Sequence, residues 1–479
     1  MLLRRPAALV AVLASAVVAS LLTVSSAPAS SVPATPVAGA AGAGDAYFPQ
    51  DGNGGYDVVH YDIHDSYRIR TGALHGWTDV TATATQDLSS FHLDLVLTPT
   101  AVTVDGVPAT YAKPSRHELR VTPANPVAAG SSFVVRVHYH GSPAALGYAG
   151  ERPFFREDDE ALATNEPHIA PWWFPANDHP TDKATYDLAV RVHRDRQVIS
   201  NGSLLGRTTT GDWTTWRWRM TRPMASYLAY FVAGRYRIER GNDRGRAWLN
   251  AVSRWFPRAQ QDSALRLLRR SPAYVRWLET QFGPYPFGST GGVVSSVFTG
   301  FALENQGRPT YPFLGSGPDA RSTVVHELAH QWFGDLVSVR RWRDIWLNEG
   351  FATWAEWRYA ETHGGPTAQT RLLRAYAGLP ADRRFWRLVV ANPGPQRLFD
   401  QPVYVRGAMA LQALRHRIGT TAFLGLLRAW TTEHADGTAT IPQFQALAEQ
   451  RTGLDLDGFF TAWLHAGRKP ARTAANGLR

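Results

Sequence analysis

The segment His326-Glu327-Leu328-Ala329-His330 constrains the fold more than any other stretch of this chain of 479 residues. Residues four positions apart lie on one face of a helix, so both imidazoles can hold the same metal ion. Glu327 lies one position further round, where its carboxylate reaches a water molecule without binding the metal. Taken alone, the segment also fits a helix that carries two surface histidines.

Glu349 completes the ligand set that a catalytic zinc site requires. It follows His330 by nineteen residues, and such a site uses three protein ligands in a tetrahedron with one open position. Gly334 can end the first helix and Asp344 can cap the next, which returns Glu349 toward the histidine face. The sequence therefore predicts one Zn²⁺ per chain, held by His326, His330 and Glu349, with water in the fourth position.

The composition indicates a large folded protein of two or three domains. Apolar residues make up 44% and charged residues 19% of the chain, which excludes wholesale disorder. Cysteine is absent, so disulfide scaffolds, thiolate zinc sites and cysteine nucleophiles are excluded. Any metal site must therefore use histidine and carboxylate side chains.

The net charge of +10 does not indicate a nucleic-acid-binding protein. Of the 50 basic residues only Lys113, Lys183 and Lys469 are lysines, and the arginines are scattered without a recognisable nucleic-acid module. A bias this strong toward arginine is typical of a high-GC genome rather than of selection for phosphate contacts. We therefore expect no nucleic-acid partner.

The first 29 residues have the pattern of an export signal. Arg4 and Arg5 precede an apolar run over residues 7–24, and the Ala-Pro-Ala sequence at 27–29 offers a cleavage site. The alternative is an uncleaved anchor, because an apolar run of about 18 residues just spans a bilayer. Ser and Thr interruptions favour cleavage, so we expect bacterial export of a secreted protein without stable membrane insertion.

The rest of the chain changes once, from strand-like to helix-like patterning. Residues 30–50 are rich in Ala, Gly, Ser and Pro and predict a flexible linker. Residues 51–245 carry β-rich segments separated by turn signals. Residues 246–470 carry apolar positions at helical spacing, and residues 471–479 form a short tail. The expected fold class is α+β, with a β domain before a mainly helical domain.

Four motifs in order resemble the aminopeptidase N-like gluzincins, a family of zinc peptidases that also includes leukotriene hydrolase. Residues 326–349, HELAHQWFGDLVSVRRWRDIWLNE, match the family's HExxH-x18-E signature. Residues 300–305, GFALEN, stand where the family has Gly-Ala-Met-Glu-Asn, and residues 403–408, VYVRGA, match its Tyr-x-Lys/Arg-Gly segment. Residues 173–180, WFPANDHP, resemble its Phe-Pro-Cys-x-Asp-x-Pro motif with Ala in place of Cys. The ordered set is more specific than any single motif.

The resemblance implies a saddle-like all-β domain followed by a thermolysin-like zinc catalytic domain. Many relatives carry a further large helical domain, whereas this chain stops soon after residues 459–463, FFTAW, which resemble the end of the catalytic domain. We therefore expect the short secreted bacterial form, without a C-terminal helical domain. Its expected substrates are peptides with a free N-terminus.

The resemblance also implies the roles of four side chains in peptide hydrolysis. Glu327 would be the general base toward a zinc-activated water, and Tyr404 would donate to the oxyanion. Glu304 would bind the substrate α-ammonium group, with Glu166 of the β domain as its partner.

Further residues are expected around this set. Gly300 and Ala302 would border the substrate backbone through strand addition. The family's Gln before the second carboxylate falls on Thr164 or Asn165, so Asn165 is a candidate substrate contact. Asp335 and Asp344 are expected either to orient the zinc histidines or to cap helices.

A secreted zinc aminopeptidase is the leading interpretation, and two alternatives remain. A thermolysin-type endopeptidase shares the zinc signature. It cleaves within a peptide, however, so its substrate would place no chain-end amine next to Glu304. A catalytically silent binding protein on the same fold would be expected to lose His326, Glu327, His330 or Tyr404, and all four are present.

Overall fold

The computed structural model describes residues 35–479. Within them, Pro36–Arg479 form one compact unit. The expected signal segment, residues 1–29, and the first residues of the expected linker lie outside the described part. In the described part, no helix has the length and apolar character that a bilayer crossing requires.

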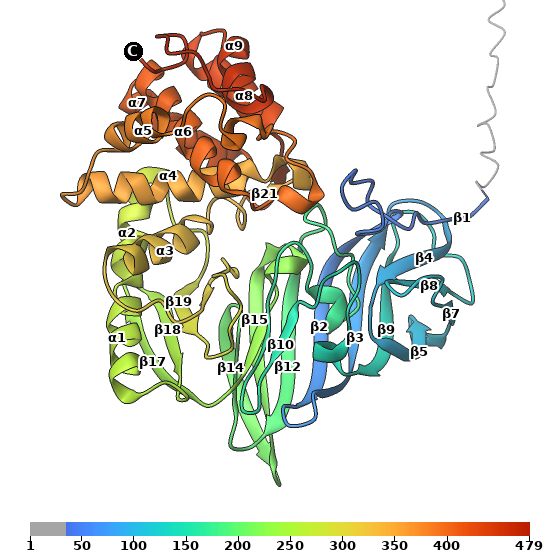
Figure 1. The fold of residues 1–479 in the computed structure, drawn as a ribbon. Helices are drawn as coiled ribbons and strands as arrows, with labels where there is room; N and C mark the ends of the chain where they lie inside the picture. The colour runs from blue at the N-terminus through green and yellow to red at the C-terminus, as the bar shows by residue number, and fades with distance from the viewer. Residues whose placement is uncertain (1–34) are drawn as a thin grey trace, which may run out of the picture. The chain divides into compact units, whose positions relative to one another are not determined.

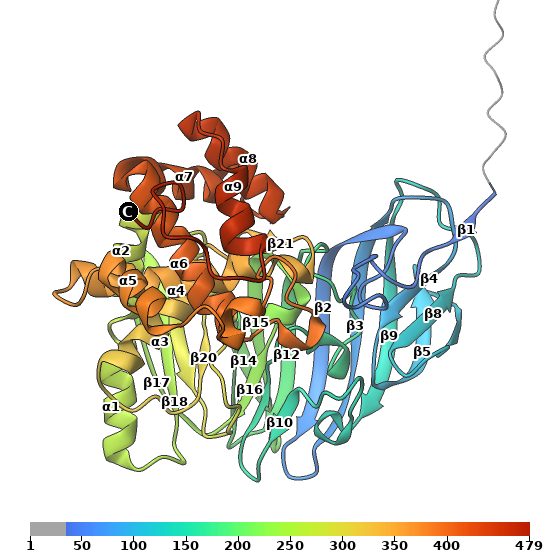
Figure 2. The same cartoon turned by 45° about the horizontal axis from the view of Figure 1, so that its top comes forward.

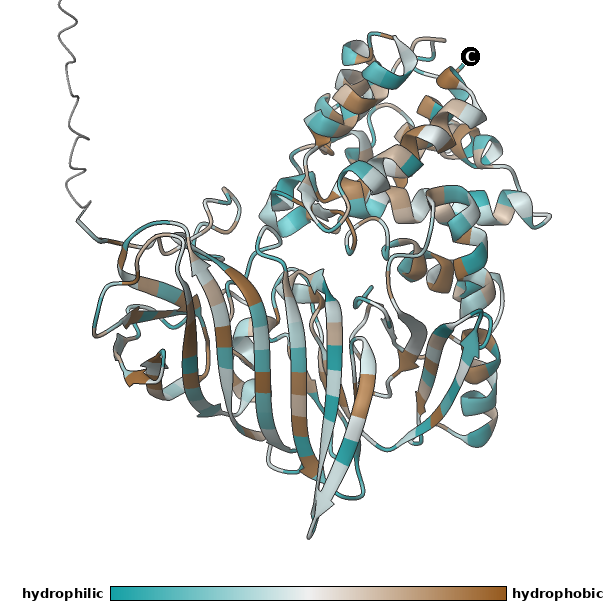
Figure 3. Cartoon of the chain, turned by 180° about the vertical axis from the view of Figure 1, so that it is seen from behind, coloured by the Kyte–Doolittle hydropathy of each residue, from teal (hydrophilic) through white to brown (hydrophobic). Residues whose placement is uncertain are grey.

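An eight-stranded sheet forms the framework of the front half of the chain, coloured from blue to green in Figure 1. Neighbouring strands are antiparallel, except that β12 runs parallel to β2. Buried and exposed positions alternate along β3 and β15, and Figure 3 shows the same alternation of apolar and polar residues. This period-two pattern buries one face of the sheet. In spatial order the strands are β14 (Ser203–Thr210), β15 (Trp213–Met224), β12 (Ala184–His193), β2 (Tyr56–Arg68), β3 (Ala73–Ala84), β9 (Ser132–Gly141), β5 (Thr98–Val104) and β6 (Val107–Pro108).

Two four-stranded sheets pack their aromatic residues against this framework. Phe91 of the first lies 5.3 Å from Phe133 of β9, and Phe231 of the second lies 6.0 Å from Tyr67 of β2, measured between ring centroids. The first sheet has the order β1 (Val37–Ala38), β4 (Leu88–Asp94), β8 (Glu118–Thr122) and β7 (Thr110–Ala112). The second has the order β10 (Phe154–Arg156), β11 (Ala161–Ala163), β16 (Phe231–Gly234) and β13 (Gln197–Ser200).

A mixed sheet and a set of helices form the rear half. The sheet order is β17 (Tyr236–Asp243), β18 (Arg246–Ser253), β19 (Ser289–Val294) and β20 (Thr310–Tyr311). In Figures 1 and 2 helix α4 lies between α3 and α6, and it packs on both. A small parallel sheet joins β21 (Ser338–Val339) to β22 (Thr438–Ala439). The helices are α1 (Arg258–Leu268), α2 (Ser271–Phe282), α3 (Pro318–Ala329), α4 (Trp346–Thr362), α5 (Ala368–Gly378), α6 (Gln401–Ile418), α7 (Thr420–Glu433), α8 (Ile441–Thr452) and α9 (Asp457–Phe460).

The expected domain boundary at residue 245 falls inside a hairpin of this mixed sheet. Strand β17 pairs antiparallel with β18 from Tyr236 to Ser253, and β18 pairs in parallel with β19. The last strand of the β domain is β16, which ends at Gly234. Residues 235–245 therefore belong to the rear domain. The sequence could not show this, because β17 has the same strand-like pattern as the strands before it.

The expected linker is a packed segment from residue 36 onward. The backbone N–H of Val37 donates to the Asp87 carbonyl oxygen, and the buried Asp45 carboxylate accepts from the backbone N–H of Trp342 at 2.8 Å. A Cβ at Gly39 would lie 2.5 Å from the carbonyl oxygen of Gly54. The small residues in this segment therefore permit close backbone packing, and the prediction of a flexible linker is wrong for residues 36–50.

Helices α4 and α6 approach each other through a pair of glycines. A Cβ at Gly350 would lie 3.2 Å from the Cα of Gly407 and 2.5 Å from the Trp346 ring. Gly350 directly follows Glu349, and Gly407 lies almost one helical turn after Tyr404. The close approach therefore sets the distance between a zinc-ligand candidate and the oxyanion candidate.

A buried arginine ties α6 to the end of the chain. Arg406 is fully buried, and its guanidinium donates only to backbone carbonyl oxygens, with N–O distances from 2.6 to 3.2 Å. Burial lowers the pKa of Arg406 to about 10. The segment expected to be a tail also packs, because Trp463 Nε1 donates to the carbonyl oxygen of Asn476 and Leu478 is buried. The acceptors of the arginine are Trp386, Leu388, Ala462, Ala466 and Arg468.

We predict that Gly407→Ala lowers the free energy of unfolding by about 1–3 kcal/mol, the usual cost of overpacking. The new methyl group would lie 3.0 Å from the Gly350 Cα and would also meet the Trp346 ring. Gly425→Ala in α7 is the matched control, because its Cβ has open space around it. That variant should be neutral or up to about 1 kcal/mol more stable. Equal stability of the two variants in urea unfolding would contradict the close-packing interpretation.

Candidate active site

The two histidines of the HELAH segment lie at the end of α3 and meet Glu349 at the start of α4. His326 Nε2 lies 3.3 Å from Glu349 Oε2, and His330 Nε2 lies 3.5 Å from the same oxygen. All three side chains are buried or nearly so. The structure therefore brings together the three predicted ligand residues, as the helical spacing and the loop after Gly334 require.

These distances fit a tetrahedral zinc ion. Ligand atoms about 2.0–2.2 Å from a zinc ion are separated by about 3.3–3.6 Å in a tetrahedron. The three ligand atoms of His326, His330 and Glu349 also lie within 4.8 Å of one another. With one carboxylate and two imidazoles, the donor set has the chemistry of a catalytic zinc site.

The other ring nitrogen of each histidine has a fixed partner. His326 Nδ1 lies 2.6 Å from Glu356 Oε1, and His330 Nδ1 lies 3.0 Å from the carbonyl oxygen of Phe333. Such partners orient metal-binding imidazoles and raise their basicity. Both contacts leave Nε2 directed toward Glu349.

The partner of His326 is Glu356, which the sequence prediction missed. Glu356 follows Glu349 by seven residues, two helical turns, so both carboxylates lie on one face of α4. That spacing is a signal that could have identified it. Asp344, which was expected to orient a histidine or cap a helix, instead binds Arg341 at 2.8 Å. Helix α4 begins after Ile345, without a side-chain cap.

A cavity of about 310 Å³ opens in front of the three candidate ligands and joins the two domains. Among its described lining residues are four carboxylates and no lysine or arginine. Glu166 reaches the cavity from the β domain, while all the other lining residues belong to the rear domain. The lining residues are Glu166, Phe301, Ala302, Leu303, Glu304, His326, Glu327, His330, Glu349, Phe399 and Tyr404.

The carboxylates of the cavity differ in protonation. Burial raises the pKa of Glu327 to about 8 despite the two nearby histidines. Burial also acts to raise the pKa of Glu349, but His330 and His326 outweigh it and lower that pKa to about 2. For His330, burial is outweighed by Glu349 and Glu304, which raise its pKa to about 9. In the metal-free protein the imidazoles therefore hold protons that a bound metal ion would displace.

Glu304 and Glu166 face the same cavity from different domains. Glu304 is buried and accepts a hydrogen bond from the Tyr227 hydroxyl at 3.3 Å. One oxygen of Glu166, Oε1, is buried without a hydrogen-bond partner. Burial and the charge of Glu304 raise the pKa of Glu166 well above its usual range. The pair is therefore a strong acceptor for a cationic group.

The backbone of Glu304 is tied to the zinc-ligand helix. Gln331, the residue after His330, donates from Nε2 to the carbonyl oxygen of Glu304 at 2.8 Å. Leu303 exchanges two backbone hydrogen bonds with Thr310. In antiparallel pairing the peptide groups alternate in direction, so those of Ala302 point away from Thr310 toward the cavity side.

Tyr404 lies beside the first histidine. Its ring stacks with that of His326 at 6.1 Å between centroids. Burial and the neighbouring carboxylate of Glu349 raise the pKa of Tyr404 well above 10. The phenol therefore stays protonated and can donate a hydrogen bond into the cavity.

Two of the expected substrate contacts do not line the cavity. Gly300 is exposed, with φ of 82°, and Asn165 donates to the carbonyl oxygen of His168 at 3.0 Å. Asn165 therefore supports the loop that carries Glu166. Phe399, just before α6, lines the cavity and was not predicted, because no motif surrounds it.

Two family models match this chain in the order of its domains. The Peptidase M1 N-terminal domain matches residues 58–228, and the Peptidase family M1 domain matches residues 268–463, which contain the histidines and Glu349. The chain belongs to the M1 family of zinc metallopeptidases.

Solved and curated relatives agree with this assignment. One similar crystal structure is that of an M1 zinc metallopeptidase mutant from Deinococcus radiodurans bound to a Tyr-Ser-Ala substrate. Its sequence is 27% identical to that of this chain. Its TM-score is 0.78, with coverage of 90% of this chain and 100% of that one. Aminopeptidase N of Lactococcus lactis subsp. cremoris is 30% identical over 64% of this chain, and aminopeptidase N of Streptomyces lividans is 26% identical over 64%. The chain spans 38% of the length of each of these two relatives.

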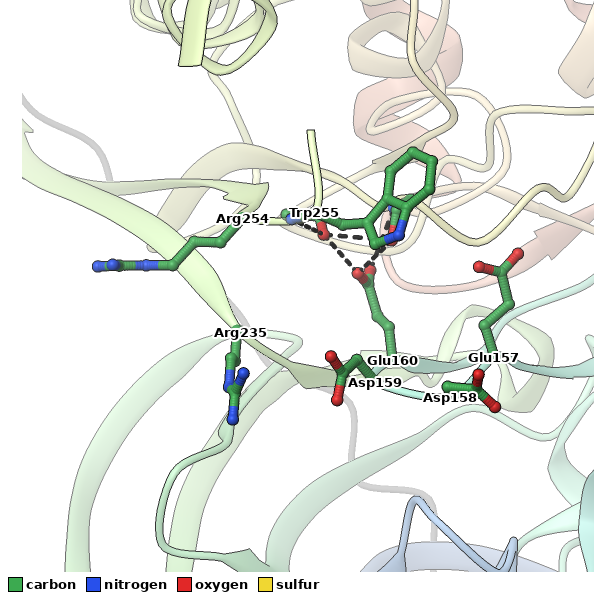
Figure 4. A pocket seen from close by; sticks show the side chains of 9 residues that line it. Glu157, Asp158, Asp159, Glu160, Arg235, Arg254 and Trp255 are labelled. Carbon is green, nitrogen blue, oxygen red and sulfur yellow. Dashed lines mark hydrogen bonds between the residues drawn. The ribbon is translucent and has the colours of Figure 1, made fainter. Parts of the chain in front are cut away.

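A second cavity of this M1 peptidase, about 590 Å³, has residues 157–160 in its lining (Figure 4) and shares no described lining residue with the cavity of the histidines. Its buried carboxylate, Glu160, accepts from the hydroxyls of Ser253 and Ser296, both at 2.6 Å, and from that of Ser295 at 2.5 Å. A carboxylate with this many donors is already satisfied. The cavity of Glu327 and Tyr404 is therefore the stronger candidate for the active site.

We predict that Glu356→Gln weakens zinc binding by this M1 peptidase about 10–100-fold, as expected when a carboxylate partner of a zinc histidine is lost. The variant removes the negative charge next to His326 Nδ1 and keeps the side-chain size. Asp344→Asn is the control, because that carboxylate contacts Arg341 rather than a histidine. Competition with a zinc chelator measures both affinities. Equal affinities would show that Glu356 does not support the metal site.

Proposed function

We propose that this M1 peptidase is a secreted aminopeptidase that removes single residues from peptides with a free N-terminus. One observation carries the proposal: the zinc-ligand candidates, Glu327 and the two carboxylates Glu304 and Glu166 line the same cavity. Export through the segment 1–29 is part of the proposal and rests on its signal-like sequence.

We assign one zinc ion to His326, His330 and Glu349. When bound, zinc supplies Lewis acidity, which polarises a carbonyl group and lowers the pKa of water toward 7. Glu356 and the Phe333 carbonyl would hold the imidazoles in the orientation that the metal requires.

Glu327 would act as the general base. Its carboxylate would take a proton from the attacking water and pass the same proton to the leaving amine, so no second proton donor is needed. Its position supports this role, because Glu327 lines the cavity from α3, the helix that also carries His326, and is not one of the three predicted zinc ligands.

Tyr404 would stabilise the oxyanion. Charge develops on the scissile carbonyl oxygen in the transition state, where a preorganised donor contributes most. The position of Tyr404 beside His326 and its protonated state support this role.

Glu304 and Glu166 would bind the α-ammonium group of the substrate, and Ala302 would align its backbone at the sheet edge. Because the carboxylates lie beside the zinc ligands, they leave room for one residue before the scissile bond. The Deinococcus radiodurans relative, solved with a Tyr-Ser-Ala substrate, supports a site for short peptides.

The deciding experiment compares aminoacyl chromogenic amides that have free or acetylated N-termini. We expect the free amides to be cleaved and the acetylated ones to be poor substrates, because acetylation removes the positive charge. Glu304→Gln should lower kcat/KM for free amides at least tenfold, the range expected when a buried charge pair is broken. Glu157→Gln, which changes an exposed carboxylate in the other cavity, is the matched control. Equal cleavage of blocked and free substrates would instead favour a thermolysin-type endopeptidase.

We predict that Tyr404→Phe lowers kcat by roughly 10²–10³ with little change in KM, because the hydrogen bond forms only in the transition state. Tyr376→Phe removes a hydroxyl that donates to the carbonyl oxygen of Pro470, outside the cavity. It should leave kcat near the wild-type value. A normal kcat for Tyr404→Phe in steady-state assays would assign Tyr404 to packing alone.

A further inference from the structure

A second group of metal-type ligands lies in the β domain. Asp94 is the last residue of β4, Glu118 is the first of β8, and His117 directly precedes it. The three side chains are between 0 and 3% exposed. One ligand atom from each lies within 4.8 Å of the others. The group shares no residue with the catalytic cavity.

Asp94 and Glu118 are directly opposite each other on neighbouring antiparallel strands. The backbone of Asp94 bonds to Ala176 on its other side, and Leu95 bonds to His117, so Asp94 and Glu118 form a non-hydrogen-bonded pair. In such pairs the side chains are closest, and like charges placed there are destabilising. Two buried carboxylates in this position therefore need either a metal ion or a proton to offset their repulsion.

Each of the three residues presents an unpartnered atom to the others. Asp94 Oδ1, His117 Nδ1 and Glu118 Oε1 are all buried without a hydrogen-bond partner. The His117 nitrogen lies 3.5 Å from the Asp94 oxygen and 3.6 Å from the Glu118 oxygen. These separations match the edges of a zinc tetrahedron, about 3.3–3.6 Å, as in the catalytic site.

The remaining atoms of these side chains are held in place. Asp94 Oδ2 accepts from the backbone N–H groups of Gly52 at 3.0 Å and Asp178 at 2.7 Å. Glu118 Oε2 lies 3.1 Å from His92 Nδ1. The His117 ring stacks with Tyr148 at 4.9 Å between centroids. Hydrogen bonds like those to the Asp94 and Glu118 carboxylates are typical of carboxylates that bind a metal ion.

A protonated His117 between two carboxylates is the competing arrangement. Charge-assisted N–H···O bonds are about 2.7–2.9 Å long, whereas both distances here are at least 3.5 Å. The geometry therefore favours a metal ion over a proton as the cation that joins the three side chains.

We propose that Asp94, His117 and Glu118 bind a second divalent metal ion, with Zn²⁺ as the ion that best fits one imidazole and two carboxylates. A cavity of about 200 Å³ lies beside the site, with His117 and Tyr148 among its lining residues. The ion joins β4 to β8 and, through Asp94, holds the backbone at Gly52 and Asp178. The chain then binds two zinc ions, one more than the catalytic signature alone predicts.

Metal content after zinc loading and removal of loosely bound ions tests the proposal on the full chain. We expect about two zinc ions per wild-type chain and about one in the double variant His326→Ala, His330→Ala, because each site holds a single ion. Adding Asp94→Asn and Glu118→Gln to the double variant should remove the remaining ion. Asp455→Asn with Asp457→Asn, in an exposed acidic group, is the matched control and should keep it. A double variant that holds no zinc would overturn the proposal.

Anomalous diffraction at the zinc edge tests the same site in the wild-type chain, even if the Asp94 and Glu118 variants fail to fold. We expect one peak at His326 and a second between Asp94 and His117. Density for zinc at the first position only, from crystals grown with saturating Zn²⁺, would assign the cluster to a protonated His117. Such a result would leave the assignment of zinc to His326, His330 and Glu349 unchanged, because the two sites share no residue.

Discussion

The rest of this structure depends on how the buried carboxylates of the candidate active site are kept close together despite their repulsion. Glu166, Glu304, Glu327 and Glu349 meet there, and no lysine or arginine is among the described lining residues. Buried carboxylates without cations are costly. In the metal-free protein the cost is met by protons on His326, His330 and Glu327. A dication and a substrate ammonium group would replace those protons, so the same charge excess accounts for both the predicted metal site and the proposed preference for a free amine.

The scaffold serves to hold these like charges at fixed positions. The HELAH helix, α3, and the Glu349 helix, α4, form one side, and the loop of Glu166 brings the β domain to the other. The close approach of α4 and α6 at Gly350 and Gly407 then allows the Tyr404 ring to lie next to His326. The loop of Glu166 and helix α6 come from parts of the chain distant from α3 in sequence, so substitutions in either part can change the geometry of the cavity.

The sequence predicted those parts of the site that lie on regular helices. The four-residue spacing of His326 and His330 and the return of Glu349 follow from helix geometry, and the structure brings all three together. The contacts of Gly300 and Asn165 depend on loop conformation, which no periodicity encodes, and neither residue lines the cavity. Residues 36–50 were misread because small residues serve close packing as well as flexible chain, and only the partner segment, here Gly54, distinguishes the two.

The buried Arg406 has a consequence for how sequence variation should be distributed. Its five acceptors are all backbone carbonyl oxygens, which any amino acid supplies. All the donors of this network therefore come from the Arg406 side chain. The amino acids at acceptor positions such as Ala462 and Ala466 can change without loss of these hydrogen bonds. A lysine could not reproduce the planar fork that reaches all five oxygens. Relatives that carry lysine at this position of the Tyr-x-Lys/Arg-Gly segment should therefore bind fewer of these oxygens than relatives that carry arginine. The acceptor positions should vary in both groups, and covariation methods would miss the contact altogether.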